Sequence, residues 1–155
     1  MKKILSLKII QDEVKICQKC DLYITRKNAV PGKGNQNADI VFIGEAPGKS
    51  EDCSGEPFIG TAGKILDNAL KDVGLTRNKV YITNIVKCRP PKNRIPNEVE
   101  KTMCNNYLEN ELTIINPKII CLLGNTSFYS ILGGKEVSKN HGKFVSKDDR
   151  MYFIT

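Results

Sequence analysis

The sequence predicts an α/β fold, namely a three-layer α/β/α sandwich around a central, mostly parallel four-stranded sheet. Two observations support this prediction. Four short apolar segments with the composition of buried strands recur along the 155 residues, and segments with helical periodicity separate them. Because strands that alternate with helices pair in parallel and are covered on both faces, we expect one sheet in a single domain spanning residues 1–155.

The predicted strands are short apolar runs, and two of them end at a glycine. They cover residues 39–44, 80–83, 117–124 and 151–155. In open parallel sheets, ligands bind at the carboxyl ends of the strands. The loops that follow Gly44, Thr83 and Gly124 are therefore the predicted site region.

Helices are predicted where apolar residues recur at spacings of three and four. They cover residues 3–16, 61–73, 98–115 and 126–132. Gly74 is suited to end the second helix and Asn97 to cap the third. The buried face of the second helix is predicted to hold Ile65, Leu66, Ala69, Leu70 and Val73. Segments 45–60 and 89–96 are expected to be loops, the latter because it contains three prolines.

Composition narrows the class of protein. The formal net charge is +7 and the sequence pI is about 9.1, which suits a polyanionic partner such as nucleic acid, although solubility alone also explains it. No apolar run is long enough to span a membrane, and the first ten residues do not resemble a signal peptide. We therefore expect a cytoplasmic protein with no membrane partner.

Six cysteines are many for a cytoplasmic chain of this length, and they favour metal ligation over disulfides. Cys17 and Cys20 form a C-x-x-C pair, and Cys88 and Cys104 supply a second pair far along the chain. Four thiolates that meet in space would hold zinc or a [4Fe–4S] cluster, and the spacing does not choose between them. Four unligated thiols are the alternative. Cys121 lies in an apolar strand and is predicted to be a core thiol.

Polar and aromatic residues cluster near the predicted strand ends. Gly44 and Gly48 flank a turn in which Glu45 carries a carboxylate, and its backbone N–H groups are suited to an anion or a carbonyl oxygen. An ordinary strand-to-helix turn is the alternative. Phe58 is either a packing anchor or a platform for a ligand. Asn84 suits the edge of a nucleobase, because its amide both donates and accepts, but it also suits a turn.

A basic, proline-rich loop follows the second predicted strand. Lys87, Arg89 and Arg94 are its candidates for contact with DNA phosphates. A solvated surface loop is the alternative. His141, the one histidine, lies between polar residues and is predicted to be a surface residue.

The order and spacing of these motifs resemble those of the family 4 uracil-DNA glycosylases, the iron–sulfur type. The matching motifs are C-x-x-C, a strand followed by GEAPG, then GEPFIGTAG, YITNIVKCRPPKNRIP, and a cysteine shortly before Tyr-Leu. The resemblance runs from about residue 16 to residue 155, and residues 87–96 are its most specific part.

The resemblance implies a role for each candidate residue. The ligands of a [4Fe–4S] cluster would be Cys17, Cys20, Cys88 and Cys104. Gly44, Glu45 and Ala46 would contact uracil and place the attacking water. Phe58 would stack on the flipped base, and Asn84 would read its edge. Glu45 is the expected catalytic residue, either by stabilising the positive sugar or by orienting water.

The implied function is hydrolysis of the N-glycosidic bond of uracil in DNA after base flipping, by a monomer that acts in base-excision repair. In the family, a His-Pro motif follows the fourth strand, and this sequence ends at Thr155 before that motif. We therefore expect residues 1–155 to be an incomplete domain. A catalytically impaired, cluster-containing DNA-binding domain of the same fold is the alternative. A zinc-stabilised α/β protein that binds a nucleotide or a small anion at residues 44–48 is disfavoured, because the sequence has no P-loop or G-x-G-x-x-G motif.

Overall fold

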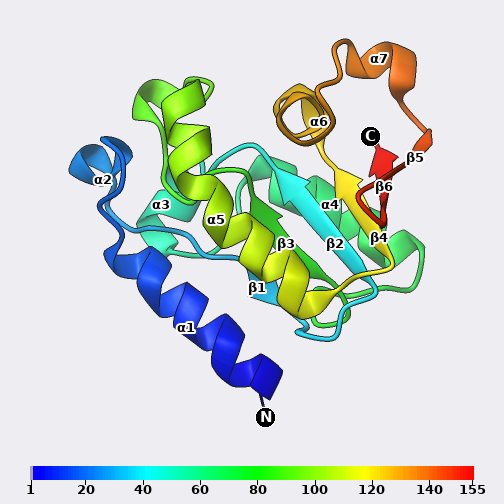
Figure 1. Ribbon diagram of the computed structural model, residues 1–155, viewed down its shortest axis with the longest axis horizontal. Helices are drawn as coiled ribbons and strands as arrows, with labels where there is room; N and C mark the ends of the chain where they lie inside the picture. Colours follow the sequence, from blue (N-terminus) through cyan, green and yellow to red (C-terminus); the bar gives the residue numbers. More distant parts are fainter. Residues whose placement is uncertain (1) are drawn as a thin grey trace.

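The computed structural model describes residues 2–155 and confirms the α/β class (Figure 1). The chain forms a six-stranded sheet in the order β1-β3-β2-β4-β6-β5. The strands are β1 (Lys33–Gly34), β2 (Ile40–Gly44), β3 (Tyr81–Asn84), β4 (Ile119–Leu122), β5 (Phe144–Lys147) and β6 (Arg150–Ile154). The central strands β3, β2, β4 and β6 run parallel, and β1 and β5 pair antiparallel at the two edges.

The four predicted strands are the parallel ones, and the two edge strands were not predicted. Strand β1 is two residues long and lacks an apolar pattern. Its pairing requires a glycine, because a Cβ on Gly34 would lie 2.1 Å from the Val80 carbonyl oxygen. Strand β5 joins β6 through Asp148 and Asp149, whose φ angles are 51° and 59°. Both φ angles of a type I′ hairpin turn are positive, and this turn lacks the glycine that usually signals one.

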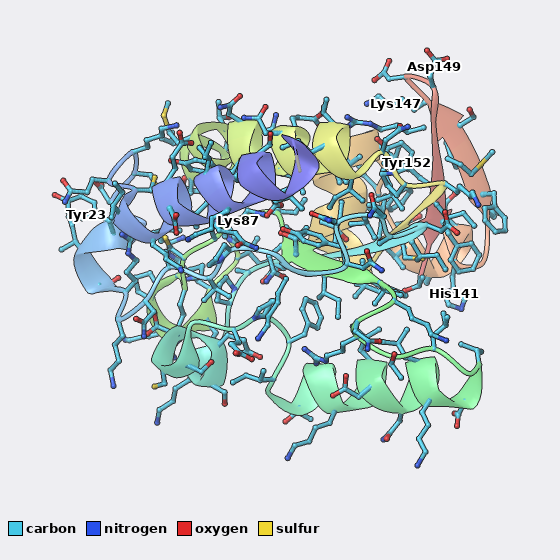
Figure 2. The ribbon with its side chains drawn as sticks, turned by 90° about the horizontal axis from the view of Figure 1, so that it is seen from below. Tyr23, Lys87, His141, Lys147, Asp149 and Tyr152 are labelled. Atoms are coloured by element: carbon cyan, nitrogen blue, oxygen red, sulfur yellow. The ribbon has the colours of Figure 1, made fainter. Side chains whose placement is uncertain are left out.

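Helices cover both faces of the sheet (Figure 2). They are α1 (Lys2–Ile16), α2 (Leu22–Thr25), α3 (Lys49–Ser54), α4 (Thr61–Asp72), α5 (Glu98–Ile115), α6 (Gly124–Leu132) and α7 (Val137–Asn140), with a 3-10 turn at Pro91–Asn93. Helices α1 and α5 lie side by side on one face, and α3 and α4 lie on the other (Figures 1 and 2). In the part of the chain that the structure describes, no helix is both long and apolar enough to cross a membrane.

A hydrophobic core fills each face of the sheet. The larger core, between the sheet and helices α1 and α5, includes Val14, Val41, Leu108, Leu112 and Ile120. The smaller core, towards α4, consists of Leu66, Leu70, Val80 and Ile82, with Phe58 packed against it. Because successive strand residues face opposite sides, β3 directs Tyr81 and Thr83 to the α5 side, and Ile82 and Asn84 to the α4 side.

Helix α4 corrects one detail of the prediction. Of the five residues expected on its buried face, only Leu66 and Leu70 are buried, whereas Ile65 and Val73 are 66% and 70% exposed. A stripe at a spacing of four is enough here, because the core that α4 covers is small. Gly74 follows the helix with a φ of 72°, as predicted.

Candidate functional site

A pocket of about 520 Å³ opens at the carboxyl ends of β2 and β3. The two strands are in register there, with Gly44 beside Asn84. The pocket walls include every residue that the sequence predicted for uracil binding, namely Gly44, Glu45, Ala46, Phe58 and Asn84. The structure therefore brings together five residues that lie within a stretch of 41 positions of the chain.

Asn84 presents an unpaired acceptor in this pocket. The residue is 2% exposed, and its Oδ1 is the one buried side-chain nitrogen or oxygen without a hydrogen-bond partner among the side chains of residues 6–155. Leaving a buried acceptor unpaired costs about 1–3 kcal/mol. An acceptor that lies in a pocket wall and has no protein donor is suited to a donor on a ligand.

Gly44 lets the aromatic ring and the amide converge. A Cβ at this position would lie 2.3 Å from Phe58 Cζ and 2.6 Å from Asn84 Oδ1. Any side chain on residue 44 would therefore occupy the space between the ring of Phe58 and the amide of Asn84. The absence of a side chain at Gly44 therefore lets the ring of Phe58 and the amide of Asn84 approach the backbone at the end of β2.

Phe58 is held in a strained backbone conformation. Its φ is 53°, in the left-handed region that non-glycine residues rarely adopt. Arg77 fixes this segment, because Nη1 donates to the Pro57 carbonyl oxygen at 2.9 Å and Nη2 donates to that of Phe58. Gly63 of α4 packs directly against the Phe58 carbonyl, where a Cβ would lie 1.7 Å from the oxygen. Arg77 and the start of α4 therefore hold the backbone of Phe58 in place, and with it the position of the ring.

Glu45 follows β2 directly and is half-buried at the pocket wall. Its Oε2 accepts a hydrogen bond from the hydroxyl of Thr126, in the first turn of α6. A carboxylate near a helix N-terminus is favoured by the helix dipole. The contact holds one oxygen of the carboxylate in place.

Glu51 was not predicted and belongs to the same wall. It is buried in α3, a helix inside the segment expected to be a loop. Its Oε2 accepts from the Gly48 N–H at 3.1 Å, and its Oε1 accepts from the N–H groups of Ile59 and Gly60 at 3.0 and 2.8 Å. Glu51 thus ties the turn after β2 to the segment beside Phe58. Its position three residues after Gly48 is a capping signal, but its bonds to residues 59 and 60 have no local signature.

The basic loop needs one correction. Lys87 was predicted to contact DNA, but its side chain is 1% exposed and pairs with Glu111 at 2.7 Å in the interior. It therefore does not reach a phosphate. Arg89 is partly buried and donates to Asn93 Oδ1 at 2.7 Å. Arg94 lines the pocket and binds both oxygens of Glu100, at 2.8 and 2.6 Å.

A second, smaller pocket contains four cysteines. Cys17 and Cys20 follow α1, Cys88 follows β3, and Cys104 lies on α5, and all four line the pocket. Two sulfurs accept hydrogen bonds, since Arg26 Nη1 donates to Cys88 Sγ at 3.0 Å and the Lys87 N–H donates to Cys104 Sγ at 3.3 Å. Such donors favour a thiolate. The structure thus brings the four predicted ligands to one place.

Burial has the opposite effect on these thiols. It raises the pKa of Cys104 to about 12 and the pKa of Cys88 above its ordinary value. Cys88 and Cys104 are therefore protonated in the absence of a metal, and metal binding would release their protons. Across residues 2–155, no three His, Cys, Asp or Glu side chains form a site for a single metal ion.

Two other sequence predictions are confirmed. Cys121 is buried in β4, and burial raises its pKa to about 11, as suits a core thiol. His141 is exposed beyond α7 (Figure 2).

Comparison with known proteins gives the family. A family profile described as the Uracil DNA glycosylase superfamily matches residues 31–155. The chain is 54% identical over 147 residues to the type-4 uracil-DNA glycosylase of Saccharolobus solfataricus, covering 91% of this chain and 68% of that protein. It is 45% identical over 132 residues to the type-4 enzyme of Thermotoga maritima, covering 85% and 69%. The chain therefore belongs to the uracil-DNA glycosylase superfamily and, within it, to the type-4 family.

The chain spans only part of these relatives. It covers 56% of the type-4 uracil-DNA glycosylase of Sulfurisphaera tokodaii, to which it is 54% identical over 123 residues. The matched part includes the pocket at the carboxyl ends of β2 and β3.

Proposed function

We propose that the protein removes uracil from DNA by hydrolysing the N-glycosidic bond of a flipped nucleotide. The unpaired Oδ1 of Asn84, beside the ring of Phe58, carries this proposal. The type-4 relatives are named as uracil-DNA glycosylases, which supports the same activity. The catalytically impaired alternative gains no support, because all five predicted pocket residues meet in one wall.

Recognition follows from the chemistry of the base. Uracil carries an N3–H donor and an O4 acceptor, which match the acceptor and the donor of the Asn84 amide. Cytosine reverses both groups, so it would leave buried polar atoms unpaired at a cost of about 1–3 kcal/mol each. Stacking on Phe58 offsets part of the lost duplex stacking, by about 1–3 kcal/mol.

Cleavage needs charge stabilisation at the sugar. As the bond between C1′ and N1 breaks, the sugar becomes positive and uracil leaves with the electron pair. Water then adds at C1′ and loses a proton. The carboxylate of Glu45, held by Thr126, is suited to stabilise the positive sugar or to orient the water.

The four-cysteine pocket is proposed to hold a [4Fe–4S] cluster. Its donor set consists of four thiols, one for each iron of such a cluster. A single zinc ion with four sulfur ligands near 2.3 Å is the alternative, and the resemblance of the chain to the iron–sulfur type of glycosylase favours the cluster. When bound, the cluster would tie the end of α1 and the loop after β3 to α5.

Iron content tests the cluster. Protein purified without oxygen should be brown and contain about four irons per chain. Cys88→Ala should abolish the colour and destabilise residues 89–96. Cys121→Ala, which alters a thiol outside the pocket, should retain the colour and leave that loop as stable as in the parent. Colourless protein with one zinc per chain would exclude the cluster.

Uracil release tests the proposed activity. The parent protein should release uracil from a uracil-containing oligonucleotide and leave the cytosine-containing one intact. Asn84→Ala should lower the excision rate on the order of 10²-fold, as loss of a preorganised group in an active site does, with little change in affinity for undamaged DNA. Phe58→Ala should weaken retention of the flipped base. Excision by both variants at the parental rate would show that the pocket is assigned wrongly.

A further inference from the structure

A buried ion pair lies against β3, on the side of the sheet opposite the pocket. Lys87 Nζ is 2.7 Å from Glu111 Oε2, and the two side chains are 1% and 0% exposed. Figure 2 labels Lys87 inside the molecule, near α1. The chemistry proposed above uses neither residue.

Every group of this pair is hydrogen-bonded. Glu111 Oε1 accepts from the Tyr81 hydroxyl at 3.0 Å and from the Gly32 N–H at 3.1 Å, and Oε2 also accepts from the Thr83 hydroxyl at 2.8 Å. Lys87 Nζ has three acceptors, which match its three protons: Glu111 Oε2, Thr83 Oγ1 at 2.5 Å and the Asn84 carbonyl oxygen at 3.0 Å. The third acceptor belongs to the residue that would read uracil.

Stability alone is a weak reason for such a pair. Burying two charges removes them from water, and replacing a buried ion pair by neutral groups of similar shape is often neutral or stabilising. A role in recognition would explain better why an ammonium group is buried here despite the free energy that its desolvation costs. The hydrogen bond from Lys87 Nζ to the Asn84 carbonyl oxygen connects the ammonium to the residue that would read the base.

The peptide group between Asn84 and Ile85 is held at both ends. Its carbonyl accepts from Lys87 Nζ, and its N–H donates to the Gly44 carbonyl oxygen at 2.9 Å. Holding both ends of a peptide group fixes the ψ angle of the preceding residue. The direction of the Cα–Cβ bond of Asn84, and with it the amide, is fixed at the point where β3 ends.

We propose that Lys87, with Glu111 as its counterion, is a positioning residue for uracil recognition. It anchors the peptide group after Asn84 from behind the sheet and so aims the amide at the base. This inference rests on the proposed function, because it assigns Asn84 the reading role.

The variant that tests it must remove the ammonium without leaving a lone buried charge. Lys87→Met together with Glu111→Gln makes the pair neutral and keeps acceptors and a donor for Tyr81, Gly32 and Thr83. Lys87→Arg is the second variant, because it retains the charge, yet its planar guanidinium does not reproduce the three contacts of a compact ammonium. Tyr81→Phe is the matched control, since it removes a bond to the same carboxylate and none to Asn84.

A double-mutant cycle with Asn84→Ala separates positioning from stability. Misplacement of an active-site group by about 1 Å costs on the order of 10²-fold. The neutral pair should therefore lower kcat/KM by at least about 10-fold while the protein remains folded, and the combined variant should be no slower than Asn84→Ala alone, about 10²-fold below the parent. Lys87→Arg should behave likewise, and Tyr81→Phe should stay within about 2-fold of the parent.

The same cycle is measured on binding, as the ratio of dissociation constants for one oligonucleotide that carries uracil or cytosine. A parent that neither excises uracil nor discriminates between the two bases overturns the proposed function. A parent that discriminates, with Asn84→Ala costing the same in both backgrounds, overturns the positioning role alone. Parental kcat/KM in either Lys87 variant also overturns it.

Discussion

A single hydroxyl orients the carboxylate expected to act at the sugar. Thr126 donates to Glu45 Oε2 from the first turn of α6. Thr126→Val keeps the side-chain shape and removes that donor, so kcat should fall by about 10-fold, with KM nearly unchanged, because the contact matters most when charge develops. Steady-state excision kinetics measure both constants. Thr126→Ser restores the hydroxyl and should recover most of kcat, and a valine variant with parental kcat would show that Glu45 needs no such support.

At the residue scale, the sequence predicted the pocket but misplaced one lysine. Gly44, Phe58 and Asn84 were identifiable because they flank predicted strands or match a motif. Lys87 lies in a basic, proline-rich stretch that resembles a surface loop, but its side chain turns beneath β3 to Glu111. Its partner is 24 positions away on another element, and a sequence pattern read locally does not reveal such a pairing.

At the scale of elements, the segment between β2 and α4 depends on a clamp from outside it. Arg77 donates to the carbonyls of Pro57 and Phe58. Because a left-handed φ is strained, Arg77→Ala should release Phe58 and lower uracil excision by about 10-fold. Asp67→Asn is the control. It alters the contact between Asp67 and Arg77 Nε, at 2.5 Å, and leaves the two bonds from Arg77 to the carbonyls in place. Excision assays on both variants test the clamp, and equal rates for Arg77→Ala and Asp67→Asn would contradict it.

The start of α5 has a pH-dependent contact. Hydrogen bonds from Arg94 lower the pKa of Glu100 below its usual value of 4.5, and the Asn97 N–H adds to the effect. Because this pKa is lowered, the ionised carboxylate of Glu100 stabilises the folded protein above pH 4.5. That stabilisation is lost as the pH falls through the pKa that Glu100 has in the folded state. Glu100→Gln should lower Tm by a few degrees at pH 7 and by progressively less as the pH falls through the lowered pKa of Glu100. Thermal unfolding across that range measures the difference, and a pH-independent difference would contradict the assignment.

The long helices and the apolar strands were predictable, and the short helices were not. Helices α1, α4 and α5 have apolar residues at helical spacing over several turns, and the parallel strands are short but continuous apolar runs. Asn97 caps α5 as expected, accepting from the Glu100 N–H at 2.9 Å. Helix α3 spans six residues and α7 spans four, which is too short for a period to be visible. Contacts such as those of Glu51 with residues 59 and 60 hold α3 in place, and they form only in the folded chain.

At the scale of the whole molecule, charge determines how the protein would approach DNA. The net charge is +7, and the loop that carries Arg89 and Arg94 borders the pocket, which Pro90, Asn93 and Arg94 help to line. Phosphate contacts made by such residues release counterions, so affinity for undamaged DNA should fall as salt rises. The position of the loop beside the pocket predicts that these contacts orient the strand for base flipping.

The two arginines should not contribute equally to that salt dependence. Arg89 donates to the neutral amide of Asn93, whereas Arg94 is paired with the carboxylate of Glu100. A paired guanidinium brings little net positive charge to the phosphates. Arg89→Ala should therefore reduce the slope of log K against log[salt] by about one unit, and Arg94→Ala by clearly less. Dissociation constants at several salt concentrations measure both slopes. Equal reductions would mean that Arg94 leaves Glu100 to bind DNA, and a slope near zero in the parent would contradict a phosphate-binding loop.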